Sequence, residues 1–214
     1  MRLVLPTLYV ILDAAMLTEP AAVTAQKLME AGVKLLQYRA KNAAARELWR
    51  ESRAIADSAR QANCTFIVND RPDVAHLAGA DGVHVGQDDL DVEQARKVIG
   101  PGRWVGVSTH NLEQFKDAAA SSADYIAVGP IFQTSSKANP DPVVGTELLR
   151  RVRALTQKPI VAIGGITLER AADVVAAGAD SVAVISDILK AKDPAATARE
   201  FIRRLDAAKP AASH

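Results

Sequence analysis

The chain has 214 residues, 49% of them hydrophobic, which is enough to bury a substantial core. Its 26 Lys and Arg residues nearly balance its 25 Asp and Glu residues, so the charge gives no sign of a basic surface for nucleic acid or for an anionic membrane. We therefore expect small-molecule partners, with no nucleic acid and no membrane.

The single cysteine and the first residues of the chain bear on the compartment. Cys64 is the only cysteine, which excludes an intrachain disulfide and a cysteine-rich zinc cluster, and we expect it to be a buried structural thiol. The apolar start resembles a signal peptide, but Pro6 and Asp13 interrupt a run that is too short to span a bilayer. These features predict a soluble cytoplasmic protein.

Eight short apolar runs, each bounded by turn residues, alternate along the chain with stretches of helical period. Such alternation is typical of repeated βα units around a parallel sheet, whose strands are apolar on both faces. The predicted strands are 8–12, 33–39, 65–69, 82–85, 103–107, 124–128, 159–163 and 181–185. They predict an α/β fold, a single (β/α)8 TIM barrel with eight parallel strands, against the alternative of a doubly wound open sheet with fewer strands.

Helical period and turn residues fill the intervals between these strands. The predicted helices are 19–31, 43–62, 111–120, 146–155 and 167–176. Small residues, often with an aspartate, precede several strands, as in LAGADGVHV and AAGADSVAV, and we interpret them as helix-to-strand turns. Eight units in roughly 200 residues leave little length for a second domain. Residues 1–208 are therefore predicted to form one catalytic barrel, and 209–214 a frayed tail.

Polar residues follow the predicted strands, at the end of the barrel where such enzymes place their chemistry. Gln37, Arg39 and Lys41 alternate by two and would point to one side, where two cations could bind a phosphate or diphosphate. A solvated strand end is the alternative. Asp70 and Asp89 close two neighbouring strands and could together bind one Mg²⁺, although each could instead cap a helix.

Later segments predict a lid and an anion site. The loop 129–145 is long for a compact chain, which favours a binding loop with Lys137 as its reactive group over a passive connection with a surface lysine. IGGI after the seventh strand and VIS after the eighth match a phosphate site that is common in barrels, although tight packing around glycine would also explain them. We interpret His84 as a hydrogen-bonded barrel residue rather than a base.

The order of these motifs resembles that of the thiamine-phosphate synthases over about residues 8–190. The segments are LYVILD, VKLLQYRAK, FIVNDRPDVAHLAGADGVHVGQDDL, VGVSTH, DYIAVGPIFQTSSK, PIVAIGGI and GADSVAVIS. IGGI alone is weak, whereas QYRAK, NDR, GVHVGQDD and GPIFQT together are specific. The resemblance implies condensation of hydroxymethylpyrimidine diphosphate with hydroxyethylthiazole phosphate to give thiamine phosphate and diphosphate. It also implies Mg²⁺ as cofactor and a dissociative mechanism, in which the pyrimidine-methyl diphosphate ionises before the thiazole nitrogen attacks.

The resemblance implies roles for individual side chains. The catalytic residues would be Arg39, Lys41, Ser108 and Lys137. The residues that hold the pyrimidine diphosphate would be Gln37, Arg39, Lys41, Asn69, Ser108 and Lys137. The metal ligands would be Asp70 and Asp89. The residues that place the thiazole phosphate would be Thr134, Ser136, Gly165, Ile185 and Ser186. After Lys137 the run ANPDPVVG departs from the more basic continuation of the family, which leaves the geometry of the lid open.

Three other functions fit parts of the sequence. A thiazole tautomerase-like isomerase would share the barrel and the phosphate site, but it would need neither the cations Arg39 and Lys41 nor the carboxylates Asp70 and Asp89. A non-catalytic phosphate-ligand-binding barrel would bind without turnover. A sugar-phosphate isomerase or epimerase is disfavoured, because no carboxylate–histidine pair emerges that could shuttle a proton. Self-association into a homo-oligomer is left open by the sequence.

Overall fold

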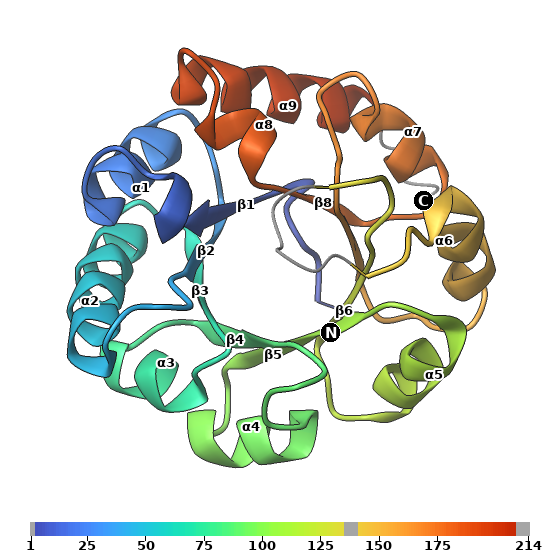
Figure 1. Ribbon diagram of the computed structural model, residues 1–214, viewed down its shortest axis with the longest axis horizontal. Coiled ribbons are helices and arrows are strands. Elements are labelled where there is room, and N and C mark those ends of the chain that lie inside the picture. The colour runs from blue at the N-terminus through green and yellow to red at the C-terminus, as the bar shows by residue number, and fades with distance from the viewer. Residues whose placement is uncertain (1–2, 135–140, 209–214) are drawn as a thin grey trace.

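Eight parallel strands close into a barrel in chain order in the computed structural model, which describes residues 3–134 and 141–208 (Figure 1). The strands are β1 (Leu8–Asp13), β2 (Leu35–Arg39), β3 (Thr65–Asn69), β4 (Gly82–Val85), β5 (Trp104–Thr109), β6 (Tyr125–Val128), β7 (Ile160–Ile163) and β8 (Ser181–Val184). β1 pairs with β2 on one side and with β8 on the other, which closes the sheet. The predicted (β/α)8 barrel is confirmed, and the doubly wound open sheet was wrong.

Helices form a ring around the strands (Figure 1). They are α1 (Ala21–Glu30), α2 (Ala45–Gln61), α3 (Pro72–Ala78), α4 (Val92–Ile99), α5 (Leu112–Ala120), α6 (Gly145–Arg153), α7 (Ala171–Ala176), α8 (Ser186–Leu189) and α9 (Pro194–Ala208), with a 3₁₀ turn at Ala14–Met16. The five predicted helices are present with shifted ends, and α7 begins four residues later than predicted. In the described part of the chain, no helix has both the length and the apolar character needed to cross a membrane.

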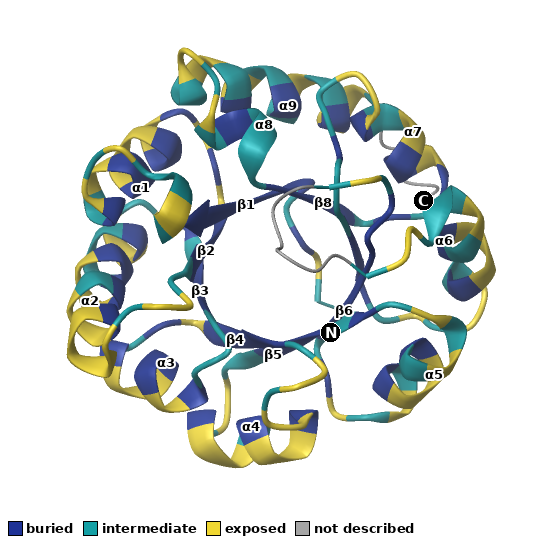
Figure 2. Ribbon diagram, viewed as in Figure 1, coloured by how far each residue is buried: buried dark blue, intermediate teal, exposed yellow. Residues whose placement is uncertain are grey.

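Two apolar layers separate the inside of the barrel from the helices. Alternate strand residues face opposite sides, so Leu8, Val10 and Leu12 pack against the helices, while Tyr9 and Ile11 face the interior. The interior cluster comprises Leu5, Tyr9, Ile11, Leu35, Ile67, Tyr125, Ala127, Val161 and Ala183. In Figure 2 the strands are almost entirely buried. Because side chains fill the lower barrel, a ligand can enter only above them, at the carboxyl ends of the strands.

Cys64 lies in the outer layer, at the end of the turn after α2. It is 5% exposed, and burial raises the pKa of its thiol to about 12. A thiol with this pKa is protonated and unreactive at neutral pH. The predicted role as a buried structural thiol is confirmed.

The aspartates that precede the strands have a common structural role. Asp81, Asp124 and Asp180 each accept a hydrogen bond from the backbone N–H of a residue at the start of the preceding odd-numbered strand, at 2.8, 2.7 and 2.8 Å. Each carboxylate therefore ties a helix-to-strand turn to the neighbouring strand. The recurring sequence element is a clamp at the amino end of the barrel, opposite the end where ligands can enter.

Replacing Asp124 with alanine is expected to lower the free energy of unfolding by about 1–3 kcal/mol, because the buried N–H of Val105 would lose its acceptor. Arg96 would also lose a carboxylate partner at 2.5 Å. Urea denaturation measures the change. Asp117→Ala is the matched control, since this exposed carboxylate on α5 has no side-chain hydrogen bond within the described residues. Equal stability of the two variants would contradict the clamp.

Candidate active site

Two adjoining cavities lie at the carboxyl ends of the strands. One has a volume of about 80 Å³, and its polar lining residues are Tyr9, Gln37, Arg39, Asn69, His84 and Ser108. The other has a volume of about 30 Å³ and is lined by Thr134, Gly164, Gly165 and Ser186, among others. Ile163, Ala183 and Ile185 line both cavities. The structure thus brings together, around one mouth, predicted site residues from β2, β3, β5 and the loops that follow β6, β7 and β8.

Arg39 is held by a carboxylate that sequence reasoning missed. Asp13 ends β1 directly beside Arg39 in the strand register, and the two side chains form a salt bridge. Asp13 is 4% exposed and also accepts a hydrogen bond from the N–H of Ala15. Since a buried ion pair fixes the geometry of both partners, Asp13 aims the guanidinium of Arg39 at the cavity. The available signal was that LYVILD, like the other strands, ends in a polar residue.

Lys41, Asp70 and Asp89 meet at the rim of the same mouth. The Nζ of Lys41 lies 3.3 Å from the Oδ2 of Asp70. Burial and the adjacent Asp89 carboxylate raise the pKa of Asp70 above its usual range, and Lys41 opposes this shift. Asp70 also has a φ of +62°, a left-handed conformation that costs a non-glycine residue free energy and is concentrated at functional sites. The fold therefore holds two like charges together at this point.

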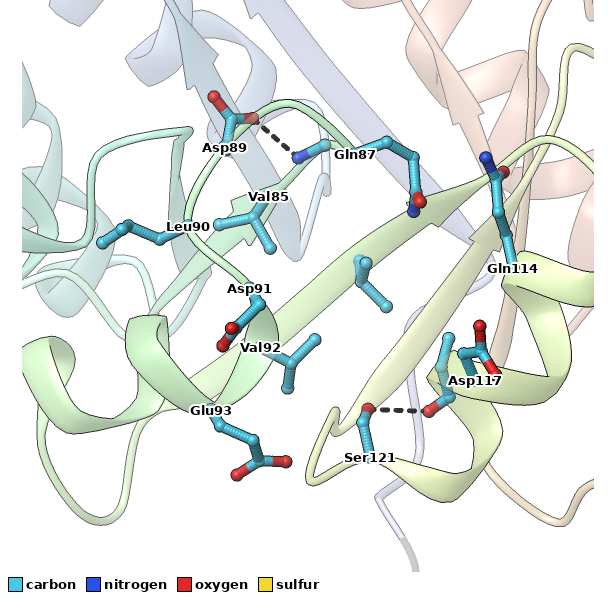
Figure 3. Close-up of a pocket in the computed structure, with 13 residues that line it drawn as sticks. Val85, Gln87, Asp89, Leu90, Asp91, Val92, Glu93, Gln114, Asp117 and Ser121 are labelled. Atoms are coloured by element: carbon cyan, nitrogen blue, oxygen red, sulfur yellow. Dashed lines mark hydrogen bonds between the residues drawn. The ribbon is translucent and has the colours of Figure 1, made fainter.

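Neither aspartate caps a helix. The residue that precedes α3 is Arg71, which makes no side-chain cap, and α4 is capped by Asp91 through a reciprocal pair of hydrogen bonds with Gln94. Asp89 instead accepts a hydrogen bond from the N–H of Gly86 at 2.7 Å, which folds the loop after β4 back on itself (Figure 3). The capping alternative is therefore wrong for both residues.

The charges at the rim fit a divalent cation. The three carboxylates Asp13, Asp70 and Asp89 outnumber the two cations Arg39 and Lys41 by one charge. Residues 3–134 and 141–208 contain no group of three or more His, Cys, Asp or Glu side chains that could hold a metal. Mg²⁺ is commonly bound by one or two carboxylates and completes its shell with water and substrate phosphates. Two adjacent carboxylates beside the cation Lys41 are therefore a chemically suitable donor set.

Ser108 and His84 are linked at the floor of the larger cavity. The Nε2 of His84 lies 2.9 Å from the Oγ of Ser108, and its Nδ1 lies 3.1 Å from the hydroxyl of Tyr125. Gln87 donates a hydrogen bond to the backbone carbonyl of Ser108 at 2.6 Å. His84 is therefore a hydrogen-bonded barrel residue, as predicted.

The smaller cavity depends on two glycines after β7. Gly164 and Gly165 have φ values of +100° and +62°. A Cβ on Gly165 would lie 2.3 Å from the carbonyl oxygen of Gln133, and one on Gly164 would lie 2.6 Å from the Cα of Pro130. The loop after β6 therefore packs directly on this backbone, and its Phe132 N–H donates to the carbonyl of Gly164 at 2.9 Å. Only glycine permits this approach, which explains the IGGI motif.

Two predicted site residues, Ser136 and Lys137, lie outside the described residues. Thr134, the last described residue before them, lines the smaller cavity. Their predicted contacts with substrate stay predictions.

A further hollow of about 250 Å³ runs from the loop after β4, where Asp89 lines it, along the outer wall between α4 and α5 (Figure 3). Four carboxylates line it, from Asp89, Asp91, Glu93 and Asp117. Asp91 caps α4, and Glu93 accepts hydrogen bonds from the N–H and the hydroxyl of Ser122 at 2.8 and 2.9 Å. Asp89 accepts from the Gly86 N–H, so three of these four groups already have structural partners, and the chemistry of the molecule is better placed at the barrel mouth, although the hollow is the larger space.

Comparison with known proteins separates the remaining possibilities. The thiamine monophosphate synthase family model matches residues 8–188. The chain is 52% identical to the thiamine-phosphate synthase of Koribacter versatilis, over 94% of this chain and 96% of that protein. The chain belongs to the thiamine-phosphate synthase family.

Two further comparisons agree with this membership. A thiamine-phosphate synthase of Chlorobium phaeovibrioides is 44% identical over 94% of this chain and 95% of its own length. The solved structure of a thiamine phosphate pyrophosphorylase from Pyrococcus furiosus superimposes with a TM-score of 0.86 at 32% identity, covering 95% of this chain and 96% of that one. The span matched by the thiamine monophosphate synthase model runs from the first residue of β1 into α8, so it includes all the residues that line both cavities.

Proposed function

We propose that the protein condenses hydroxymethylpyrimidine diphosphate with hydroxyethylthiazole phosphate to give thiamine phosphate and diphosphate. The observation that carries the proposal is that Lys41, Asp70 and Asp89 contact one another after the ends of β2, β3 and β4, next to the cavity that Arg39 lines and beside a second, glycine-lined cavity. Two anionic substrates need two neighbouring sites, and the family membership identifies which pair they are.

The larger cavity would take the pyrimidine diphosphate. Gln37, Asn69 and Ser108 line it and would contact this substrate, while Arg39 and Lys41 would hold the diphosphate. Lys137 would reach the same diphosphate from the loop after β6. Carbon–oxygen cleavage increases the negative charge on the leaving diphosphate, and groups already aimed at that charge stabilise the transition state most. In this proposal Asp13 contributes indirectly, because it fixes the direction of Arg39.

Asp70 and Asp89 would hold Mg²⁺ at the rim. The ion, when bound, would supply positive charge next to the leaving diphosphate. The carboxylates would fix the ion next to Lys41. The bound ion would in turn offset the repulsion between the two carboxylates, which together with burial raises the pKa of Asp70.

The smaller cavity would take the thiazole phosphate. Thr134, Gly165, Ile185 and Ser186 line it, and Ser136 would join them from the loop after β6. The exposed backbone after β7 offers N–H groups without side chains in the way, which suits a phosphate. Because Ile163, Ala183 and Ile185 line both cavities, the thiazole ring would lie against the pyrimidine across a shared apolar wall.

The chemistry would require no general base. The attacking thiazole nitrogen carries no proton to be removed, so the catalytic work is binding, orientation and charge stabilisation. The environment of His84 agrees with this reading, since both of its ring nitrogens already have hydrogen-bonding partners.

Purified protein with Mg²⁺ and both substrates is expected to yield thiamine phosphate and diphosphate in equal amounts. Chromatography with a diphosphate-release assay measures both products, and a known thiamine-phosphate synthase provides the positive control. A thiazole tautomerase would instead isomerise a thiazole phosphate without the pyrimidine substrate. A silent binding barrel would give heat in calorimetry and no product. Either result, with the control enzyme active, would contradict the proposal.

The wider setting belongs to the same proposal. The partners would be the two small-molecule substrates, the reaction would take place in the cytoplasm, and a homo-oligomer would be compatible with a site built within one chain.

A further inference from the structure

Five side chains form a continuous hydrogen-bonded row across the floor of the larger cavity, from β2 to β5. Gln37 donates through Nε2 to the hydroxyl of Tyr9 at 2.7 Å, and the hydroxyls of Tyr9 and Tyr125 lie 3.0 Å apart. The row continues from Tyr125 to the Nδ1 of His84 at 3.1 Å and from the Nε2 of His84 to the Oγ of Ser108 at 2.9 Å. We call these residues, Gln37, Tyr9, Tyr125, His84 and Ser108, the floor chain.

Packing holds the floor chain in place. Tyr9 and Tyr125 are 1% and 0% exposed and meet edge to face, with ring centroids 6.1 Å apart. The His84 ring stacks on Tyr125 at 5.5 Å. Gly106 of β5 makes room for the Tyr125 ring, because a Cβ there would lie 2.1 Å from the Cζ of that tyrosine. A glycine in the middle of a strand weakens the strand, so its place here follows from the ring that it admits.

The protons of the floor chain can be assigned step by step. Burial raises the pKa of both tyrosines, so each phenol is neutral and carries one proton. Tyr9 accepts from Gln37, and within the described residues the hydroxyl of Tyr125 is the one acceptor in reach of its own proton, so we assign Tyr9 as the donor to Tyr125. Tyr125 then donates to the Nδ1 of His84, which leaves the imidazole proton on Nε2, directed at the Oγ of Ser108. With this assignment, every donor in the row points from Gln37 toward Ser108.

We propose that Tyr9, Tyr125 and His84 are positioning residues, which polarise the floor chain in one direction and thereby set what its two ends offer to the ligand. At one end, Gln37 has used Nε2, and its Oε1 accepts no hydrogen bond within the described part of the chain, so it is an acceptor for the ligand. At the other end, Ser108 accepts from His84, so its hydroxyl proton is a donor for the ligand. The three positioning residues act only through these two ends.

The inference rests on the proposed function, in which Gln37 and Ser108 contact the pyrimidine diphosphate. An aminopyrimidine matches the pattern, because its exocyclic amino group donates and its ring nitrogens and diphosphate oxygens accept. An analogue with an oxo group in place of the amino group would face the Oε1 of Gln37 with another acceptor. Because the row has a fixed direction, the Gln37 amide could not rotate by 180° to present its NH₂ group to the analogue without breaking its hydrogen bond to Tyr9. The floor chain would therefore set specificity for the amino form.

The test breaks the row at its centre. Tyr125→Phe keeps the ring over Gly106 and removes one hydroxyl, which breaks the hydrogen bond of Tyr125 to Tyr9 and its hydrogen bond to His84, while Tyr9 keeps Gln37 and His84 keeps Ser108. We expect the KM for the pyrimidine diphosphate to rise about tenfold or more, as for other broken buried hydrogen bonds. The KM for the thiazole phosphate should stay within about twofold, because none of the described residues that line the smaller cavity belongs to the floor chain. Tyr38→Phe is the control, since this tyrosine, 4% exposed, packs in the outer layer.

A second measurement needs no turnover. The ¹⁵N chemical shifts of the His84 ring, assigned with a His84→Gln variant, report which nitrogen carries the proton. We expect the proton on Nε2 in the wild type and a mixed or reversed state in Tyr125→Phe. A proton on Nδ1 in the wild type would overturn the assigned direction, and unchanged or equally raised KM values in Tyr125→Phe would overturn the positioning role. If the wild type made no thiamine phosphate, the proposed function would fail, while the tautomer would still decide the direction of the row.

Discussion

Asp89→Asn is expected to lower kcat by at least about 100-fold while the fold is retained, because a neutral amide replaces one of the two carboxylates of the proposed Mg²⁺ site. Asparagine keeps an oxygen that can accept from the N–H of Gly86, so the loop after β4 should hold its shape. Steady-state kinetics with both substrates and a titration of Mg²⁺ measure the loss. Asp88→Asn is the control, since this exposed neighbour has no side-chain hydrogen bond among the described residues, and its turnover should match that of the wild type.

Thermal unfolding separates the metal role from a packing role. Asp70 has a raised pKa in the fold, so the metal-free protein should lose stability as the pH rises through that pKa. Removing the Asp89 charge should weaken this loss, and the metal-free variant should be at least as stable as the wild type at neutral pH. Saturating Mg²⁺ should raise the Tm of the wild type and leave that of Asp89→Asn nearly unchanged. Equal stabilisation of both proteins, or full turnover in the variant, would remove Asp89 from the metal site.

The strands were predictable because their signal is local. Each is a short apolar run that ends in a turn. A strand that is buried on both faces can be recognised from such a run alone, without knowledge of its neighbours in the sheet. The helix boundaries were less predictable. α7 begins at Ala171 because residues 167–170 form a turn, in which Arg170 N–H bonds to the Thr167 carbonyl and Asp187 accepts from the N–H of Leu168. Asp187 lies in α8, so this boundary depends on a contact between separate elements.

The candidate site was predictable where it consists of strand ends. Parallel strands in a closed barrel bring their carboxyl ends to one mouth, so residues as distant as Arg39 and Ser108 had to line the same space. Asp13 was missed because nothing in the sequence states that its neighbour in the barrel is Arg39. The floor chain was missed for the same reason, since Tyr9 and Tyr125 are 116 positions apart and each looks like an ordinary core aromatic. Such contacts follow from register, which only the closed barrel fixes.

Gly165→Ala is expected to raise the KM for the thiazole phosphate at least about tenfold and to lower the free energy of unfolding by about 1–3 kcal/mol. Two effects combine at this residue. The φ of +62° strains any residue with a Cβ, and the new Cβ would lie 2.3 Å from the Gln133 carbonyl and 2.9 Å from the Cβ of Phe132. The backbone of the loop after β6 must therefore move. The same loop contains Thr134, which lines the smaller cavity.

Gly102→Ala separates the clash from the strain. Gly102 has a φ of +75°, nothing lies within 4 Å of its would-be Cβ, and it belongs to the turn before β5, at the opposite end of the barrel from the mouth. This variant should lose about 1 kcal/mol of stability and keep both KM values. Urea denaturation and kinetics at saturating pyrimidine diphosphate give the comparison. If Gly165→Ala bound the thiazole phosphate as the wild type does, the cavity between the loops after β6 and β7 would not be the thiazole phosphate site, because the loop displacement would have had no effect on binding there.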